Sequence, residues 1–187
     1  MAAPPAKGHL VVAAPTLEDP NFHRSVVLLL AADDDGALGV VLNRPSDTLI
    51  GEIVPTWASL ASSPPVLFVG GPVQPNAAIC VGKCPGAPDD DSDGYSPLTD
   101  DLGTVDLHRE PEEIGVGLEG LRVFTGYSGW GPGQLEAEIE AGAWFVLERR
   151  AEDVLSPQPE ALWEQVLRRQ GGWLAVLSRH PVDASLN

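Results

Sequence analysis

The part of the chain that most restricts the fold is the glycine-rich segment at residues 125–138, TGYSGWGPGQLEAE. It holds four glycines and a proline, and these two residue types are strong signals of turns. The apolar run Leu121–Thr125 predicts a strand before the segment, and Gln134–Ala141 predicts a helix that begins near Pro132. We therefore expect a glycine-rich loop between a strand and a helix.

Neighbouring residues argue against two functional interpretations of this loop. The unpaired N–H groups at a helix start can bind phosphate, but Glu136 and Glu138 already place negative charge in the first turns and would repel it. The order Gly126-Tyr127-Ser128-Gly129 is similar to a nucleophile elbow, yet Trp130 stands where the elbow requires a small glycine. A structural turn is therefore favoured over a phosphate site or a catalytic Ser128.

A β-hairpin is predicted in the N-terminal part of the chain. Ser25–Ala31 and Leu38–Asn43 are apolar runs of strand length. Asp35-Gly36 between them is a hairpin signal, because glycine accepts the positive φ that such a turn demands. Pro45 should end the second strand because it cannot donate to a ladder, and a short helix over Thr48–Val54 is expected to follow.

The remaining patterns predict an α+β fold. Apolar runs of strand length occur at His9–Ala14, Val66–Val69, Ala77–Val81 and Ala143–Leu147. An amphipathic pattern over Pro159–Arg169 predicts a helix. Strands dominate and do not alternate regularly with helices, which favours a mostly antiparallel or mixed sheet.

Length and charge limit the possible functions. With 187 residues, of which 43% are hydrophobic, the chain should form one domain over residues 1–187. Its formal net charge of −16 repels nucleic acid and anionic lipid. Arg149-Arg150 and Arg168-Arg169 are isolated basic pairs, which we interpret as solvated ends of helices or strands. We therefore expect neither direct nucleic-acid contact nor membrane binding.

The segment Pro85–Glu113 is the most acidic part of the chain. It contains ten Asp or Glu residues and few apolar ones, which predicts an acidic, mobile loop over residues 85–113. Asp89–Gly94 partly matches a calcium-binding loop, but the flanking helices and the final glutamate of that motif are absent from the pattern. The segment therefore gives no prediction of a metal site.

Cysteine and histidine spacing points to neither a metal nor a cofactor. Cys80 and Cys84 are the only cysteines, and the four histidines are scattered along the chain. Cys80 fits a small core residue, whereas Cys84 opens a loop and could be exposed. The longest apolar run, Val26–Ala32, is too short to span a bilayer, and no signal-peptide core is apparent. We expect a cytoplasmic protein.

The glycine-rich segment also carries a family resemblance. GYSGWGPGQLE resembles the signature of the YqgE/AlgH family, bacterial proteins without an agreed biochemical activity, some of which are labelled transcriptional regulators. Residues 19–29, 39–45 and 70–73 are similar to other family segments in the same order, and with Trp144 they span nearly the whole chain. The resemblance implies a bent, bifurcated sheet curled into a pseudo-barrel with peripheral helices.

Seven residues that match the family motifs form our candidate binding surface: Arg24, Asn43, Arg44, Tyr127, Trp130, Gln134 and Glu136. They lie at predicted strand ends and turns, where binding sites are commonly built. We expect them to converge on one concave polar surface. Arg44 would bind an anion or carboxylate, Asn43 and Gln134 would direct hydrogen bonds, and Tyr127 and Trp130 would form an aromatic wall. The open alternative is structural, with Arg24 or Arg44 paired to Glu136.

Three functional classes follow from these observations. A non-catalytic binding or regulatory protein, acting through a small ligand or a protein partner, is favoured. A DNA-binding transcriptional regulator and a hydrolase-like enzyme with an unrecognised site are the alternatives. In place of the Glu-His that the family often carries after the second strand, this chain has Ala31-Ala32-Asp33, so no role of that histidine applies here.

Overall fold

The computed structural model describes residues 4–181, and the expected domain 1–187 extends beyond it at residues 1–3 and 182–187. The strands of the described part are β1 (Leu10–Ala13), β2 (Val26–Asp33), β3 (Gly36–Val41), β4 (Pro45–Leu49), β5 (Val66–Val69), β6 (Val73–Lys83), β7 (Tyr95–Pro97), β8 (Leu102–Val105), β9 (Gly120–Trp130) and β10 (Trp144–Leu147). Its helices are α1 (Ile50–Ile53), α2 (Gln134–Glu140), α3 (Leu162–Arg168) and α4 (Gly172–Leu177), with 3₁₀ turns at Pro55–Leu60, Pro111–Glu113 and Pro159–Ala161.

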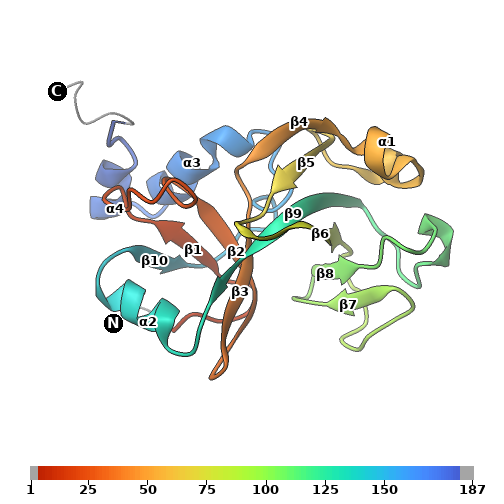
Figure 1. Cartoon of the computed structure of the whole chain (residues 1–187), viewed down its shortest axis with the longest axis horizontal. Helices are drawn as coiled ribbons and strands as arrows, with labels where there is room; N and C mark the ends of the chain where they lie inside the picture. The colour runs from red at the N-terminus through yellow and green to blue at the C-terminus, as the bar shows by residue number, and fades with distance from the viewer. Residues whose placement is uncertain (1–3, 182–187) are drawn as a thin grey trace.

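The strands form one curled sheet in the order β10-β1-β2-β3-β9-β6-β8-β7, with β4 and β5 branching from β9 (Figure 1). Every pair is antiparallel except β5 with β9, which run parallel. The prediction of a mostly antiparallel, bent sheet with peripheral helices is therefore confirmed. The curled sheet has the shape of a half-barrel.

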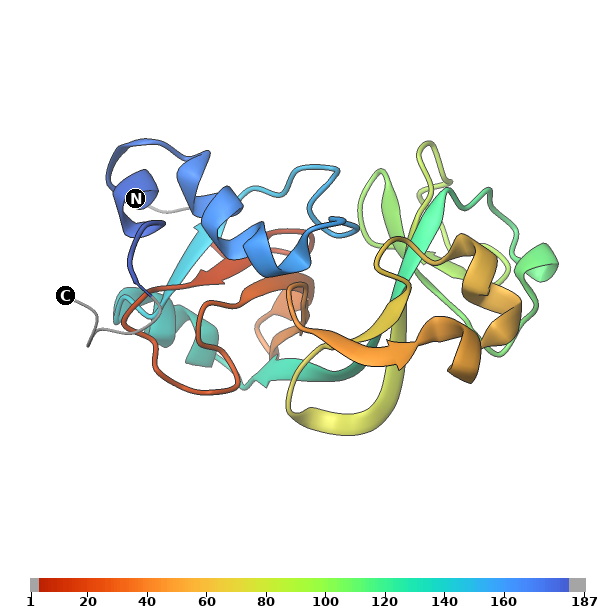
Figure 2. The ribbon, with the colours of Figure 1, turned by 90° about the horizontal axis from the view of Figure 1, so that it is seen from above.

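Strand β9 joins the two halves of this sheet. Its residues Gly120–Tyr127 pair with β6, and Ser128–Trp130 pair with β3. The predicted start of the loop between strand and helix is therefore wrong, because the segment GYSGW continues the strand up to Trp130. Ladder partners on both sides outweigh the local turn preference of the glycines. Figure 2 shows β9 extending between the two halves of the molecule.

The predicted hairpin is confirmed as β2 and β3. Asp33 pairs with Gly36, so Asp34 and Asp35 form the tip of the turn and the glycine is the first residue of β3. Gly36 has a φ of +129°, and a Cβ there would lie 2.2 Å from the Trp130 carbonyl oxygen. The glycine is therefore required both by its backbone conformation and by the approach of β9.

Two local predictions are corrected by tertiary pairing. Residues Pro45–Leu49 form β4, so Pro45 begins a new strand and the helix after it shortens to Ile50–Ile53. The acidic segment is not loop throughout, since it contains β7 and β8. Tyr95 and Leu102 of these strands are buried, which places the apolar residues of the segment in the core.

The C-terminal helix pattern is confirmed. Pro159–Ala161 forms a 3₁₀ turn that leads into α3, and the helix buries four apolar side chains against the sheet: Leu162, Trp163, Val166 and Leu167. Helix α2 packs on the other face through Leu135. Among the described residues no helix is long and apolar enough to cross a membrane.

Several polar or reactive side chains are more buried than expected. Cys84 is buried like Cys80 and is not exposed. Arg149 Nη2 lies 2.5 Å from Asp101 Oδ1, and Arg169 contacts both carboxylate oxygens of Asp153 at 2.6 and 2.7 Å. The prediction that both basic pairs are solvated therefore holds for Arg150 and Arg168, which are exposed. It is wrong for Arg149 and Arg169, which are held in largely buried ion pairs.

Candidate functional site

The turn that leads into β2 is held in an unusual conformation. Arg24 has a φ of +53°, a left-handed backbone that costs energy for a residue other than glycine. Asn43, which follows shortly after β3, stabilises this turn. Its Nδ2 donates to the Arg24 carbonyl oxygen at 2.8 Å, and its Oδ1 accepts from Val26 N at 2.9 Å. Both polar atoms of the Asn43 side chain therefore bond backbone groups of this chain.

Arg44 follows at the exit of β3 and reaches back over the same turn. Its Nη2 donates to the His23 carbonyl oxygen at 2.6 Å, and its Nη1 makes a long contact of 3.5 Å with the Pro20 carbonyl oxygen. Desolvation lowers the pKa of Arg44, and that of Arg24 as well. Within residues 4–181 neither guanidinium forms an ion pair with a carboxylate.

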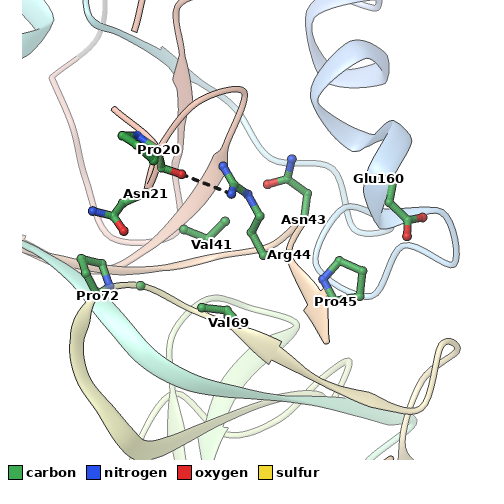
Figure 3. Close-up of a pocket in the computed structure, with 10 residues that line it drawn as sticks. Pro20, Asn21, Val41, Asn43, Arg44, Pro45, Val69, Pro72 and Glu160 are labelled. Atoms are coloured by element: carbon green, nitrogen blue, oxygen red, sulfur yellow. Dashed lines mark hydrogen bonds between the residues drawn. The ribbon is translucent and has the colours of Figure 1, made fainter. Parts of the chain in front are cut away.

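A pocket of about 470 Å³ opens beside Arg44. Figure 3 shows Arg44 between Pro20 on one side and Asn43 and Glu160 on the other. Besides Asn21, the other lining residues of the pocket are apolar or small and are Val41, Pro45, Val69, Gly71 and Pro72. Its volume lies in the range typical of ligand sites.

A second pocket of about 530 Å³ adjoins the first and shares Pro20, Asn43, Arg44 and Glu160 with it. Its other lining residues are mostly charged and are Glu18, His23, Arg24, Trp163 and Glu164. We call the two pockets together the Arg44 groove. It runs from an apolar part, past the Arg44 guanidinium, to a charged part beside α3.

Arg24 forms the wall of the charged part. Its guanidinium lies 4.0 Å from the centre of a Trp163 ring, and its Nη1 donates to the His180 carbonyl oxygen at 2.7 Å. Stacking on an aromatic face suits the planar arginine side chain. Arg24 is therefore fixed against the C-terminal helices, whereas Arg44 is the guanidinium common to both parts of the groove.

Comparison with known proteins identifies the family. A sequence profile described as AlgH-like matches residues 10–175. The chain belongs to the AlgH-like family. A UPF0301 protein from Streptomyces coelicolor is 50% identical over 182 residues, covering 96% of this chain and 94% of its own length. A UPF0301 protein from Thermobifida fusca is 45% identical over 194 residues, with 96% and 94% covered.

Solved structures agree with this assignment. A crystal structure of a Corynebacterium diphtheriae protein has a TM-score of 0.89 and 35% identity, covering 95% of this chain and 94% of that one. The solution structure of the AlgH protein from Pseudomonas aeruginosa has a TM-score of 0.66 and 26% identity, covering 98% and 99%. The AlgH-like family is uncharacterised, so these matches supply a fold without a reaction.

The seven predicted site residues do not share one surface in this AlgH-like chain. Arg24, Asn43 and Arg44 lie together at the Arg44 groove. Trp130 and Gln134 instead line a separate pocket of about 340 Å³.

The other predicted roles are corrected as well. Tyr127 packs against the main core, so it forms no aromatic wall with Trp130. Glu136 is exposed and forms no ion pair in the described part of the chain, so the structural pairing with Arg24 or Arg44 is also wrong.

Glu138 organises this separate pocket, which lies outside the Arg44 groove, and was missed as a site residue. Its Oε2 accepts from the indole N–H groups of Trp130 and Trp144 at 3.0 and 2.9 Å, and its Oε1 accepts from Gln134 at 2.9 Å. Gln134 in turn accepts from Gly131 N at the helix start. The spacing of Gln134 and Glu138 by one helical turn was the available signal, whereas the approach of Trp144 depends on the fold.

Arg122 was missed because it lies within an apolar strand. It is buried in β9, where it stacks 4.2 Å from the centre of the Phe68 ring and donates to three carbonyl oxygens, those of Ser63, Val154 and Ser156. Burial lowers the pKa of Arg122 to about 10, so it stays charged at neutral pH. It fixes the loop that precedes Glu160 of the Arg44 groove.

Ser128 and His23 show no catalytic pairing within the part of the chain that the structure describes. Ser128 is buried and its Oγ donates to the Gly70 carbonyl oxygen at 3.1 Å. His23 Nδ1 lies 3.1 Å from the Leu17 carbonyl oxygen. Both side chains are engaged with backbone groups, and a nucleophile needs a side-chain base within hydrogen-bond reach.

Proposed function

We propose that this AlgH-like protein is a non-catalytic binding protein with a regulatory role, which takes the anionic group of a small ligand or protein partner in the Arg44 groove. The observation that carries the proposal is the position of Arg44. It lies at the junction of two pockets, forms no ion pair in the part of the chain that the structure describes, and is held there by its own backbone contacts.

The chemistry of arginine supports an anionic ligand. A guanidinium carries five N–H donors, and Arg44 uses two of its nitrogens on the carbonyl oxygens of Pro20 and His23. The remaining donors suit a carboxylate or phosphate, which accept paired hydrogen bonds from this fork. The contacts already made hold the side chain in place, so less conformational entropy is lost when a ligand binds.

A thermal-shift screen tests the proposal. The native chain, Arg44→Gln and the matched surface variant Arg179→Gln are melted with a panel of carboxylates, nucleotides and phosphorylated metabolites. A ligand present at 100 times its dissociation constant stabilises by about 2.7 kcal/mol, which raises the melting temperature by several degrees.

We expect an anion that stabilises the native chain and Arg179→Gln but not Arg44→Gln. Arg179 is exposed and lines neither pocket, so its variant controls for the loss of one positive charge. Circular dichroism establishes that Arg44→Gln is folded, and Arg44→Lys replaces it if it is not. Stabilisation that is equal in all variants would contradict the proposal.

A further inference from the structure

The Arg44 groove has a fixed order of chemical environments. Its apolar part contains Val69, which is 47% exposed and therefore presents a hydrophobic surface that the fold leaves uncovered. Arg44 stands in the middle, and the charged part lies beyond it. A ligand that fills the groove must therefore carry an apolar group at one end and an anionic group next to it.

The charged part contains Arg24 and three glutamates, two of which have no cationic partner among the described residues. Glu164 forms an ion pair with Arg168. Glu18 and Glu160 form none among the described residues, and both side chains are exposed at the groove. Glu160 lines both pockets. These two carboxylates complement a positive charge at the other end of the ligand.

We propose that the groove binds the C-terminal end of a peptide or protein. The terminal carboxylate contacts Arg44, the last side chain is apolar and enters the part lined by Val69, and a lysine or arginine just upstream lies toward Glu160 and Glu18. This inference rests on the proposed function and adds the chemical class of the ligand to it.

A peptide terminus fits this order because it combines all three groups in one short segment. The two pockets, of about 470 and 530 Å³, adjoin and share lining residues, so one short segment can occupy both. Capture of a C-terminal carboxylate by fixed donors is a known mode of peptide recognition. The strongly negative net charge of −16 also favours a partner whose tail is basic.

The first experiment compares two peptides by fluorescence anisotropy with the full chain at about 0.15 M salt, where the Debye length is about 8 Å. Both are six-residue peptides labelled at the N-terminus and ending in lysine, serine and leucine. One has a free carboxylate and the other a C-terminal amide. We expect the amide to bind on the order of tenfold more weakly, since it loses a charge-assisted hydrogen-bonded pair.

The second experiment exchanges charges. Replacing the peptide lysine by glutamate should weaken binding on the order of tenfold, and Glu160→Lys should reverse this preference. The matched control is Glu152→Lys, which makes the same change of net charge at an exposed residue outside both pockets. A purely structural Glu160 would not produce a reversal.

A third variant keeps the test valid if Arg44→Gln does not fold. Val69→Asp should abolish the preference for a terminal leucine over a terminal aspartate, whereas Val73→Asp should retain it. Both valines are substantially exposed, and Val73 lines neither pocket of the groove. Circular dichroism checks that both variants fold.

The outcomes separate this inference from the proposed function. Equal binding of the acid and the amide would overturn the inference. Anions that stabilise the chain through Arg44, together with no peptide binding, would overturn the inference and leave the proposed function standing. If no anion stabilises the chain and no peptide binds, the inference and the proposed function are both contradicted. Discrimination against the amide together with charge reversal by Glu160→Lys supports the inference.

Discussion

Buried polar side chains in this protein differ in whether the fold satisfies them. Arg122 Nη1 and Nη2 donate to three backbone carbonyl oxygens, which compensates for much of the desolvation of its charge. Tyr95 is equally buried, yet its hydroxyl has no hydrogen-bond partner among the described residues. The first side chain links strand β9 to two loops, whereas the second contributes mainly its apolar ring.

Tyr95 should make stability fall at high pH. Burial first, then the nearby Cys84 and Asp101, raises the pKa of Tyr95 to about 12 from an ordinary value of about 10. The native state then keeps a proton that the unfolded chain releases. The stabilisation of the native state by the protonated Tyr95 is complete below pH 10. It is lost between about pH 10 and 12, where the free energy of unfolding falls with a slope approaching 1.4 kcal/mol per pH unit.

Urea denaturation of Tyr95→Phe checks this prediction. At pH 7 the variant should unfold with a free energy within about 1 kcal/mol of the native chain, because the lost hydroxyl had no partner. Above pH 10 it should lose less stability than the native chain. Tyr127→Phe, which changes the other tyrosine, should lose as much stability above pH 10 as the native chain does. Parallel pH profiles for native chain and Tyr95→Phe would refute the assignment.

Contacts between strands explain the glycine motifs better than ligand binding does. The backbone at Gly70-Gly71, between β5 and β6, lies directly against β9 at Gly126 and Tyr127. A Cβ at Gly71 would lie 2.2 Å from the Tyr127 carbonyl group, and one at Gly126 would lie 2.4 Å from the Gly71 carbonyl oxygen. Two motifs that are far apart in sequence are therefore glycine-rich because they contact each other.

Gly71→Ala should destabilise the protein by about 3 kcal/mol through overpacking and a φ of +156° that alanine tolerates poorly. The control is Gly117→Ala, where a Cβ would have no atom within 4 Å and which should change stability by less than about 0.5 kcal/mol. Chemical denaturation monitored by circular dichroism measures both. Equal stability of the two variants would show that the close approach is unimportant.

Helix α2 is attached to β9 and β10 through Glu138. Glu138→Gln should lower the free energy of unfolding by about 1–3 kcal/mol, because an amide replaces a charged acceptor of three hydrogen bonds. Tryptophan fluorescence should shift as well, since two indole N–H groups lose this acceptor. The matched control is Glu136→Gln, whose exposed side chain should leave both unchanged.

The net charge of the sequence leads us to predict that the protein does not bind DNA directly. The net charge is −16, and Arg149, Arg168 and Arg169 are engaged in ion pairs. We expect anisotropy titrations with labelled duplex DNA at about 0.15 M salt to show no saturable binding below about 100 µM, the weak end of non-specific affinities. Tighter, salt-dependent binding would support the alternative of a DNA-binding regulator.

Local patterns predicted those elements whose stability depends on nearby residues. The β2–β3 hairpin, β5, β10 and the amphipathic helix around α3 were all apparent from apolar periodicity and turn residues. The register of the hairpin in the structure explains part of the site. It pairs Val27 with Val41, which brings the residues before β2 close to those after β3.

Features that depend on distant partners required the folded chain. GYSGW continues as a strand because β3 and β6 supply hydrogen bonds from elsewhere in the sequence. The acidic segment contains strands because β7 and β8 continue the sheet from β6. The seven predicted residues do not form one surface, because β9 carries Tyr127 into the main core and places Trp130 against α2. Sequence patterns report local periodicity, whereas the wall that Glu160 adds to the groove depends on long-range packing.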